Sequence, residues 1–277
     1  MSGNYTQGYS KATTGTHASR TVQSDASFLI DRIKPTDKIL DVGCGPGSIT
    51  SGFGSLVPQG SVLGIDLSVD VLIAACDALP KDITNVAFQA ADLLAGLPFP
   101  DDSFDVVFSS QLFPHLSSTA MKLTALVEMK RVLKPGGILA TRDAAELHFY
   151  PRKYNLDRLW GENTRKAHNH GEEDAEDADV KGFPGGIMPA LIRQAGFSAS
   201  KISVGAGTTV HSGAETRRRY VDGNLGRLTQ GDSFRESWVR AGISEAEIHE
   251  TEHALRAWGA DEDAWYVALQ AEIVAEL

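Results

Sequence analysis

Short runs of β-branched and apolar residues alternate with longer amphipathic stretches between residues 38 and 144. The short runs have the length of β-strands, and the longer stretches keep the spacing of amphipathic helices. Strand–helix–strand alternation implies parallel strands joined by right-handed crossovers. We therefore predict an α/β fold, a doubly wound sheet with helices on both faces. The expected strands are 38–42, 61–65, 86–89, 104–108 and 138–142, and the expected helices are 49–56, 68–79 and 119–133.

Two further segments flank this core. A helix is expected over 16–33, before the first strand, and two late strands are expected at 200–210 and 264–274. Two late strands fit an antiparallel edge added to a parallel sheet. In the second late strand, the apolar residues that alternate at period two are Trp265, Val267, Leu269, Ala271 and Ile273. The helices expected after residue 146 are 156–166, 187–195, 214–227, 233–241 and 245–258, and those beyond residue 212 would cap the strand ends.

The composition excludes several classes of protein. The chain has 277 residues, of which 42% are hydrophobic, which is ample for a sizeable core. No run approaches the ~20 apolar residues of a membrane helix, and residues 1–11 lack the apolar region of a signal peptide. Cys44 and Cys76 are too few for a disulfide framework or a structural zinc site, so we expect a reducing, cytoplasmic location. The net charge of −10 argues against nucleic acid as a partner.

The motif DVGCGPGS at 41–48 follows the first expected strand and opens a helix. Glycine lets the backbone turn tightly and approach a ligand with no Cβ in the way. The dinucleotide pattern G-x-G-x-x-G is not met, because Ser48 and Thr50 stand where a glycine is required. A Walker loop would need Gly-Lys-Ser/Thr, which is also missing here. Neither a pyrophosphate nor a triphosphate ligand is supported, and a nicotinamide oxidoreductase is disfavoured.

Two carboxylates follow at the ends of the next strands. Asp66 ends the second expected strand. Its distance along the chain from the glycine loop is near the spacing at which an acid accepts hydrogen bonds from both ribose hydroxyls. Asp92 follows the third strand, where it could accept from an adenine amino group. Either residue alone would more often be a helix cap or a turn residue. Together with a glycine loop that lacks phosphate signals, they indicate a nucleoside ligand without phosphates.

The runs KILDVGCGPGSIT, GIDLS, AADLLAGLPFPDDSFDVVFSS and EMKRVLKPGGILATRD resemble class I S-adenosylmethionine-dependent methyltransferases of the UbiE-like kind. The resemblance covers about residues 15–145 and weakens beyond them. It implies a seven-stranded, Rossmann-like and mostly parallel sheet that binds S-adenosylmethionine along its strand ends and releases S-adenosylhomocysteine. On this basis we expect an N-terminal lid and helix at 1–34, a cofactor-binding core at 35–145, and the rest of the sheet with a helical substrate cap at 146–277.

The resemblance also assigns roles to individual residues. Asp41 would accept hydrogen bonds around the glycine loop and from the ammonium group of the cofactor. Asp66 would hold the ribose, and Asp92 would hold the adenine amino group. The whole expected set consists of these three acids, the loop glycines Gly43, Gly45 and Gly47 under the methionine part, Leu67 and Leu93 beside the ring together with Ala91, and Ser109 and Gln111 on the methyl side.

The N-terminal stretch 4–21 resembles a group of small-molecule methyltransferases that includes fungal enzymes acting on gliotoxin-type dithiols. This resemblance implies S-methylation of a natural-product thiol in secondary metabolism. Two alternatives stay open: O- or C-methylation of a quinone or polyketide, and a non-catalytic module that only binds the cofactor. The intact set of glycines and acids argues against the second alternative.

Methyl transfer from a sulfonium is an in-line displacement that depends on alignment and on exclusion of water. A thiol with a pKa of about 8.5 is partly ionised near neutrality, so a modest base suffices. The sequence after the fourth strand, SSQL, lacks the Asp/Asn-Pro-Pro-aromatic motif of amino-methylating nucleic-acid enzymes. No convincing carboxylate cluster for a catalytic divalent ion is found, and the acidic run at 172–179 is most simply a solvated loop, with metal binding or a partner contact as alternatives. The catalytic candidates are His115, Arg142 and Asp143. Alternatively, His115 has a capping or surface role, and Arg142 and Asp143 form a local ion pair. The substrate-binding candidates are Tyr5, Tyr9, His17, Arg20, His148 and Tyr150.

Overall fold

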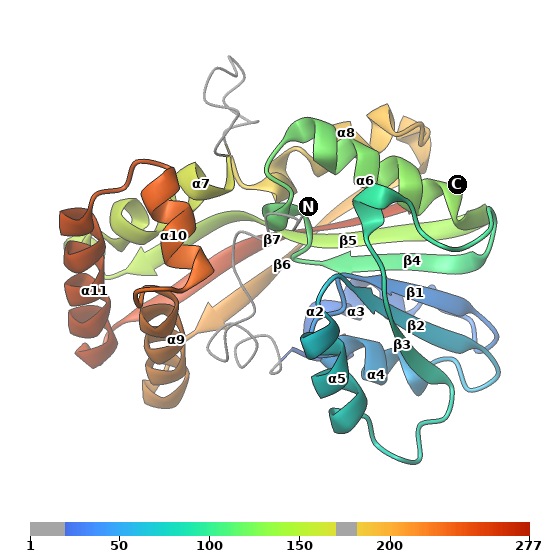
Figure 1. Ribbon diagram of the computed structural model, residues 1–277, viewed down its shortest axis with the longest axis horizontal. Coiled ribbons are helices and arrows are strands. Elements are labelled where there is room, and N and C mark those ends of the chain that lie inside the picture. The colour runs from blue at the N-terminus through green and yellow to red at the C-terminus, as the bar shows by residue number, and fades with distance from the viewer. Residues whose placement is uncertain (1–19, 170–181) are drawn as a thin grey trace.

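The computed structural model describes residues 20–169 and 182–277, which form a seven-stranded sheet in the order β3-β2-β1-β4-β5-β7-β6 (Figure 1). The first five strands are parallel, and β7 runs antiparallel between β5 and β6. The predicted doubly wound sheet with an antiparallel edge is therefore confirmed. The strands are β1 (Lys38–Val42), β2 (Ser61–Asp66), β3 (Val86–Ala90), β4 (Phe104–Ser110), β5 (Leu133–Tyr150), β6 (Ile202–His211) and β7 (Trp265–Glu276).

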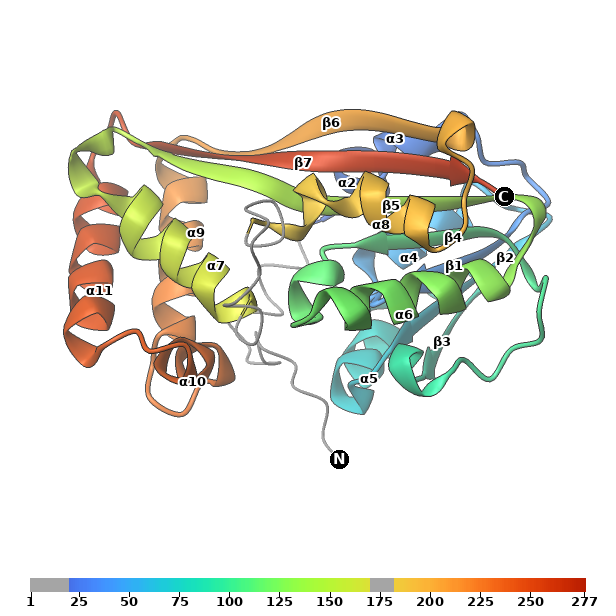
Figure 2. The same ribbon diagram turned by 90° about the horizontal axis from the view of Figure 1, so that it is seen from above.

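Helices cover both faces of the sheet (Figure 2). One core lies between the sheet and α6 (Thr119–Arg131) and α8 (Met188–Gln194). The opposite core lies between the sheet and α2 (Val22–Asp25), α3 (Ser27–Ile30) and α4 (Ser48–Gly54), while α5 (Val69–Ala78) packs on β2 and β3. Within the described ranges, no helix is long and apolar enough to cross a membrane.

The single helix expected over 16–33 is not formed in the part that the structure describes. Thr21 and Ser24 make a capping box that starts α2, and Ala26, with a φ of −137°, separates α2 from α3. This φ is far from the helical value of about −63°, so the helical hydrogen bonds are interrupted and two short helices replace the long one. Residues 16–19 of the expected helix lie outside the described ranges.

Strand β5, Leu133–Tyr150, is much longer than the expected strand 138–142, so the predicted bounds of this strand are wrong. Its pairing with β4 ends at Arg142, but its pairing with β7 continues from Ile138 to Tyr150, with a bulge between Ala144 and Glu146. Antiparallel partners supply hydrogen bonds that let β5 extend beyond the parallel strands. We call this three-stranded extension, residues 143–150, 207–211 and 265–270, the platform. The expected boundary at residue 145 falls inside it.

A second set of helices packs on the platform, far from the glycine loop (Figures 1 and 2). Phe149 and Tyr266 of the platform form a separate core with Trp160, Trp238 and Trp258 from this set. These cap helices are α7 (Asn163–His168), α9 (Ala214–Arg227), α10 (Ser233–Arg240) and α11 (Glu245–Ala260), preceded by the π-helix η4 (Asp157–Glu162). Short 3-10 turns connect the elements at η1 (Leu93–Ala95), η2 (Phe113–His115), η3 (Arg152–Tyr154), η5 (Pro184–Gly186) and η6 (Ala199–Lys201).

Two tryptophans at one end of the platform should differ sharply in their contribution to stability. Trp258 is fully buried, and its Nε1–H donates to the Tyr150 carbonyl oxygen at 2.8 Å, whereas Trp265 is 39% exposed and stacks on the Tyr150 ring. We expect Trp258→Ala to lower the free energy of unfolding by about 3–5 kcal/mol, because it leaves a large cavity. Trp265→Ala should cost about 1 kcal/mol. If urea denaturation shows the same loss of unfolding free energy in both variants, the cap helices do not form a separate core around Trp258.

Candidate functional site

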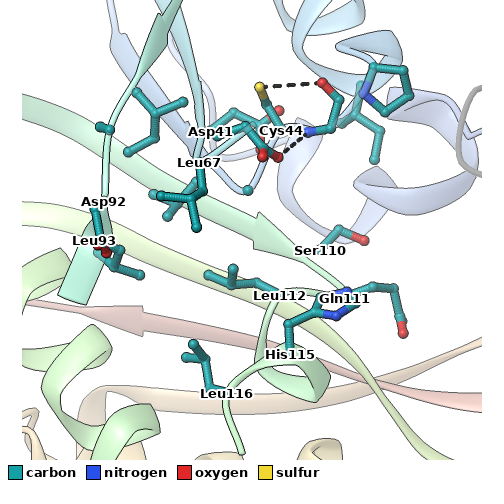
Figure 3. Close-up of a pocket in the computed structure, with 18 of the residues that line it drawn as sticks. Asp41, Cys44, Leu67, Asp92, Leu93, Ser110, Gln111, Leu112, His115 and Leu116 are labelled. Carbon is teal, nitrogen blue, oxygen red and sulfur yellow. Dashed lines mark hydrogen bonds between the residues drawn. The ribbon is translucent and has the colours of Figure 1, made fainter. Parts of the chain in front are cut away.

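A pocket opens at the carboxyl ends of β1, β2, β3 and β4 (Figure 3). Strands β1 and β4 are neighbours here, and doubly wound folds bind ligands in the crevice at such a switch in strand order. Including its open mouth, the pocket holds about 1170 Å³, and we call it the donor pocket. It brings together most of the residues expected to bind a cofactor, namely Asp41, Gly43, Gly45, Asp66, Leu67, Ala91, Asp92, Leu93 and Gln111.

Two members of the expected set lie elsewhere among the described residues. A Cβ on Gly47 would stand 2.5 Å from the Phe88 ring, so this glycine is required for packing and lies outside the lining. Ser109 is fully buried, and its neighbour Ser110 lines the pocket instead. Because successive side chains of a strand point to opposite faces, only one of the two serines can face the ligand.

The glycine loop is bonded to the end of β2 through its backbone amides. The N–H groups of Gly43 and Cys44 both donate to the Ile65 carbonyl oxygen, at 2.8 and 2.9 Å. The N–H group of Gly45 donates to Oδ2 of Asp66 at 3.0 Å. Loops that bind phosphate point such amides at the ligand. These three amides are already used inside the protein, which agrees with the expectation of a ligand without phosphates.

Open space lies over the middle of the loop. Gly45 has a φ of +53°, and a Cβ there would meet nothing within 4 Å. Gly43 has a φ of +72°, and a Cβ there would stand 2.9 Å from the Leu112 side chain. Positive φ values favour glycine at both positions. The loop therefore presents bare backbone to the pocket, where a ligand can approach closely.

Carboxylates dominate the charged lining of the donor pocket. Among the described lining residues, Asp41, Asp66 and Asp92 are acidic, and Arg20 is the arginine. Asp66 is buried and accepts from two backbone amides, while Asp92 is exposed and accepts from the Leu94 amide at 2.9 Å. Such a lining suits a cationic ligand that carries an ammonium and a sulfonium group.

Asp41 has an unusual ionisation. Its pKa is raised to about 7, because burial outweighs a hydrogen bond from Thr50 that lowers the pKa, and the nearby charge of Asp66 adds to the rise. The Thr50 hydroxyl donates to Oδ2 of Asp41 at 2.6 Å. The carboxyl therefore changes charge near neutrality.

A second pocket adjoins the first, between the platform and the cap helices. It holds about 1330 Å³ including its open mouth, and we call it the acceptor-side pocket. Arg20 and Gln111 line both pockets and so mark their common wall. Its lining also includes Asp25, Arg142, Trp160, Thr209, Tyr220, Tyr266 and Gln270.

Gln111 has a strained backbone at this wall. Its φ is +56°, in the left-handed region that costs a non-glycine residue about 1–3 kcal/mol. Its N–H donates to the Arg142 carbonyl oxygen at 2.8 Å, and its Nε2–H donates to Oε1 of Gln270 at 2.6 Å. Strain of this kind at a residue shared by two pockets makes Gln111 a candidate functional residue.

The expected catalytic residues separate into different environments. His115 is buried and lines the donor pocket, and burial, followed by the charges of neighbouring basic groups, holds its pKa well below the usual range. Arg142 lines the acceptor-side pocket, where it donates to Asp25 at 2.9 Å and to Glu272 at 3.1 Å. Asp143 forms no ion pair with Arg142, because the two side chains leave β5 on opposite faces.

Asp143 supports the turn that carries His115. Its Oδ1 accepts from the Phe113 amide at 3.2 Å, at the start of η2, and burial raises its pKa to about 7. Within the described part of the chain, Asp143 lines neither pocket. It acts on the site through the position of η2.

The expected substrate-binding residues are only partly brought together. Arg20 lines both pockets, whereas His148 and Tyr150 line neither of them as the described residues define them. His148 contacts Asp157 at 2.9 Å, and Tyr150 stacks on Trp265. The cause is the length of β5, which carries both residues to the far end of the platform. Tyr5, Tyr9 and His17 lie outside the described residues.

Sequence reasoning missed most of the acceptor-side pocket. Tyr220 lies on α9, whereas Tyr266 and Gln270 lie on β7, and only the folded sheet brings them to Arg142 and Thr209. The sequence contains one signal for this pocket: Gln270 is a polar residue on the same face of strand β7 as Tyr266. Such a residue in a buried row is a candidate for a specific hydrogen bond.

Residues 39–137 match the protein family described as methyltransferase domain. The chain is 47% identical to the "Probable methyltransferase ltbC" of Aspergillus luteorubrus, over 98% of this chain and 96% of that protein. It is 40% identical to the "Ubiquinone/menaquinone biosynthesis C-methyltransferase UbiE" of Ectopseudomonas mendocina, over 39% of this chain and 41% of that one. Among solved structures, the YcgJ protein from Bacillus subtilis has the same fold, with a TM-score of 0.57 at 19% identity, over 90% of this chain and 96% of that chain.

Replacing Asp66 by alanine should weaken binding of S-adenosylhomocysteine by about 2–4 kcal/mol if this carboxylate accepts the two ribose hydrogen bonds expected from the sequence. Calorimetry would then show a dissociation constant at least about 30-fold higher. Asp70→Ala is the matched control, since Asp70 is an exposed acid at the start of α5 and, among the described residues, is not part of either pocket. If Asp66→Ala binds S-adenosylhomocysteine with unchanged affinity, Asp66 does not hold the ribose.

The ionisation of Asp41 predicts a pH dependence of binding. Its pKa of about 7 leaves it neutral below that pH, and the neutral form attracts the cationic ligand less. The affinity for S-adenosylmethionine should therefore rise from pH 6 to pH 7.5, and the rise should approach tenfold per pH unit at the acid end of this range. Above about pH 7.7 the ligand's own amino group begins to titrate. Asp41→Asn should bind more weakly and without this slope; a slope that persists in the variant would assign it to another group.

Proposed function

This chain belongs to the class I S-adenosylmethionine-dependent methyltransferases, and we propose that its acceptor, a small molecule, binds in the acceptor-side pocket and is methylated on sulfur. The preferred acceptor is a natural-product thiol or dithiol. The observation that carries the proposal is the common wall of the two pockets at Gln111 and Arg20. A displacement requires donor and nucleophile to meet in line, and two adjoining pockets provide that arrangement.

The donor pocket fits S-adenosylmethionine, which supplies a methyl group activated by a positively charged sulfur. We assign the ribose to Asp66, the adenine amino group to Asp92 and the ammonium group to Asp41. The carboxylate-rich lining and the bare backbone at Gly45 support this assignment. Leu67 and Leu93 lie where they can flank the adenine ring, and both are labelled in Figure 3.

The weakness of the available bases supports a thiol. His115 is held neutral, with a pKa well below its usual range, so it accepts a proton poorly. A thiol needs little assistance, because its pKa of about 8.5 already leaves some thiolate at neutral pH. Arg20 in the lining favours the thiolate further by its positive charge. We assign to His115 only the modest proton uptake that a thiol still requires, and to Asp143 the support of the turn that carries His115.

Methylation of oxygen or carbon, as in quinone or polyketide tailoring, is the alternative. The relative from Ectopseudomonas mendocina is named a C-methyltransferase, but it matches only 39% of this chain. An unactivated alcohol or carbon acid would require a stronger base than His115.

The direct test is methyl transfer from methyl-labelled S-adenosylmethionine to a panel of a reduced dithiol, a monothiol, a phenol and a hydroquinone. We expect a thioether from the dithiol, detected by mass spectrometry, and much slower transfer to oxygen or carbon. His115→Ala should slow the dithiol reaction without weakening S-adenosylhomocysteine binding. Transfer to the phenol or hydroquinone with none to sulfur would overturn the thiol assignment.

A further inference from the structure

We propose that Gln270 is a positioning residue for methyl transfer, which holds Gln111 at the wall between the donor and acceptor-side pockets. The inference rests on the proposed function, in that the second pocket receives the acceptor. Gln270 lies on β7, is 4% exposed, and lines the acceptor-side pocket. Its Oε1 accepts from Nε2–H of Gln111 at 2.6 Å, across a sequence separation of 159 residues.

Gln270 belongs to a closed ring of hydrogen bonds. Its Nε2–H donates to Oγ1 of Thr209 at 3.3 Å, and Nη2–H of Arg142 donates to the same oxygen at 3.3 Å. The Arg142 carbonyl oxygen then accepts from the backbone N–H of Gln111, which completes the ring. Both the main chain and the side chain of Gln111 are thus held by one group of residues.

The ring is anchored in the buried part of the sheet. Arg142 is 2% exposed, and it also donates to Asp25 at 2.9 Å and to Glu272 at 3.1 Å. A buried guanidinium with carboxylates on two sides has little freedom to move. Strands β5, β6 and β7 each contribute a member of the ring, so it is supported by regular structure.

This support matters because Gln111 would not adopt its conformation unaided. Its φ of +56° is unfavourable for a residue with a Cβ, and its long side chain has many rotamers. The two hydrogen bonds fix the backbone and the amide together. Since Gln111 lines both pockets, a loosened Gln111 alters the alignment of donor and acceptor while the glycine loop and Asp66 remain in place.

The kinetic consequence is specific. A misplacement of about 1 Å in a reacting pair can cost about 100-fold in rate. Loss of the Gln270 hydrogen bond should therefore lower kcat by a larger factor than it raises the dissociation constant for S-adenosylmethionine, because Gln111 is one lining residue of the donor pocket among many and Gln270 itself lies outside the lining given by the described residues.

The test compares Gln270→Leu, which removes both hydrogen bonds, with Gln270→Glu, which keeps an acceptor for the Gln111 amide. With the best acceptor of the panel above, we expect kcat to fall about 10- to 100-fold in Gln270→Leu and to recover in Gln270→Glu. Gln89→Leu, an exposed position on β3, is the matched control and should behave as the unmodified protein. In a Gln111→Gly background, Gln270→Leu should have no additional effect.

A measurement without an acceptor separates this inference from the proposed function. In the full chain with S-adenosylhomocysteine bound, NMR should show a side-chain amide that exchanges slowly with solvent, is lost in Gln111→Gly, and exchanges fast in Gln270→Leu. If that pattern is found but no thiol is methylated, the acceptor assignment fails and the positioning role stands. If thiols are methylated and Gln270→Leu keeps both its kcat and the slow amide, the positioning role is wrong.

Discussion

The end of strand β2 determines what this protein can bind. The Ile65 carbonyl oxygen and the Asp66 carboxylate together accept the amides of Gly43, Cys44 and Gly45, so the glycine loop is folded onto its own sheet. A loop with its amides used in this way cannot surround a phosphate. It can present bare backbone and buried carboxylates, which match the methionine and ribose parts of S-adenosylmethionine. The specificity for an unphosphorylated, cationic donor follows from these few hydrogen bonds.

The second constraint is the unequal length of the strands. Strands β1, β2 and β4 end at the donor pocket, whereas β5, β6 and β7 continue past it and form the platform on which the cap helices pack. The step between short and long strands creates the space of the acceptor-side pocket. The parallel half of the sheet binds the donor, and the antiparallel half carries the cap. Gln111 lies where the two halves meet.

Local patterns in the sequence predicted the parallel half well, because its strands and helices alternate in chain order. The platform could not be predicted in the same way, since β5 owes its length to β7, more than a hundred residues later. The alternation on β7 was misleading: Trp265 and Leu269 are exposed, and Tyr266, Ala268 and Gln270 are buried, because the cap covers that face. Likewise, the partners of Arg142 are Asp25 and Glu272 rather than adjacent Asp143. Each of these contacts depends on chain segments that meet only in the folded molecule.

A crystal structure of the full chain with S-adenosylhomocysteine would show directly whether the glycine loop and Asp66 bind an unphosphorylated donor. We expect the ribose hydroxyls on Asp66, the amino-acid part over Gly45, and the sulfur at the wall formed by Gln111, facing the acceptor-side pocket. A ligand whose ribose lies away from Asp66, or whose sulfur faces away from Gln111, would contradict this expectation.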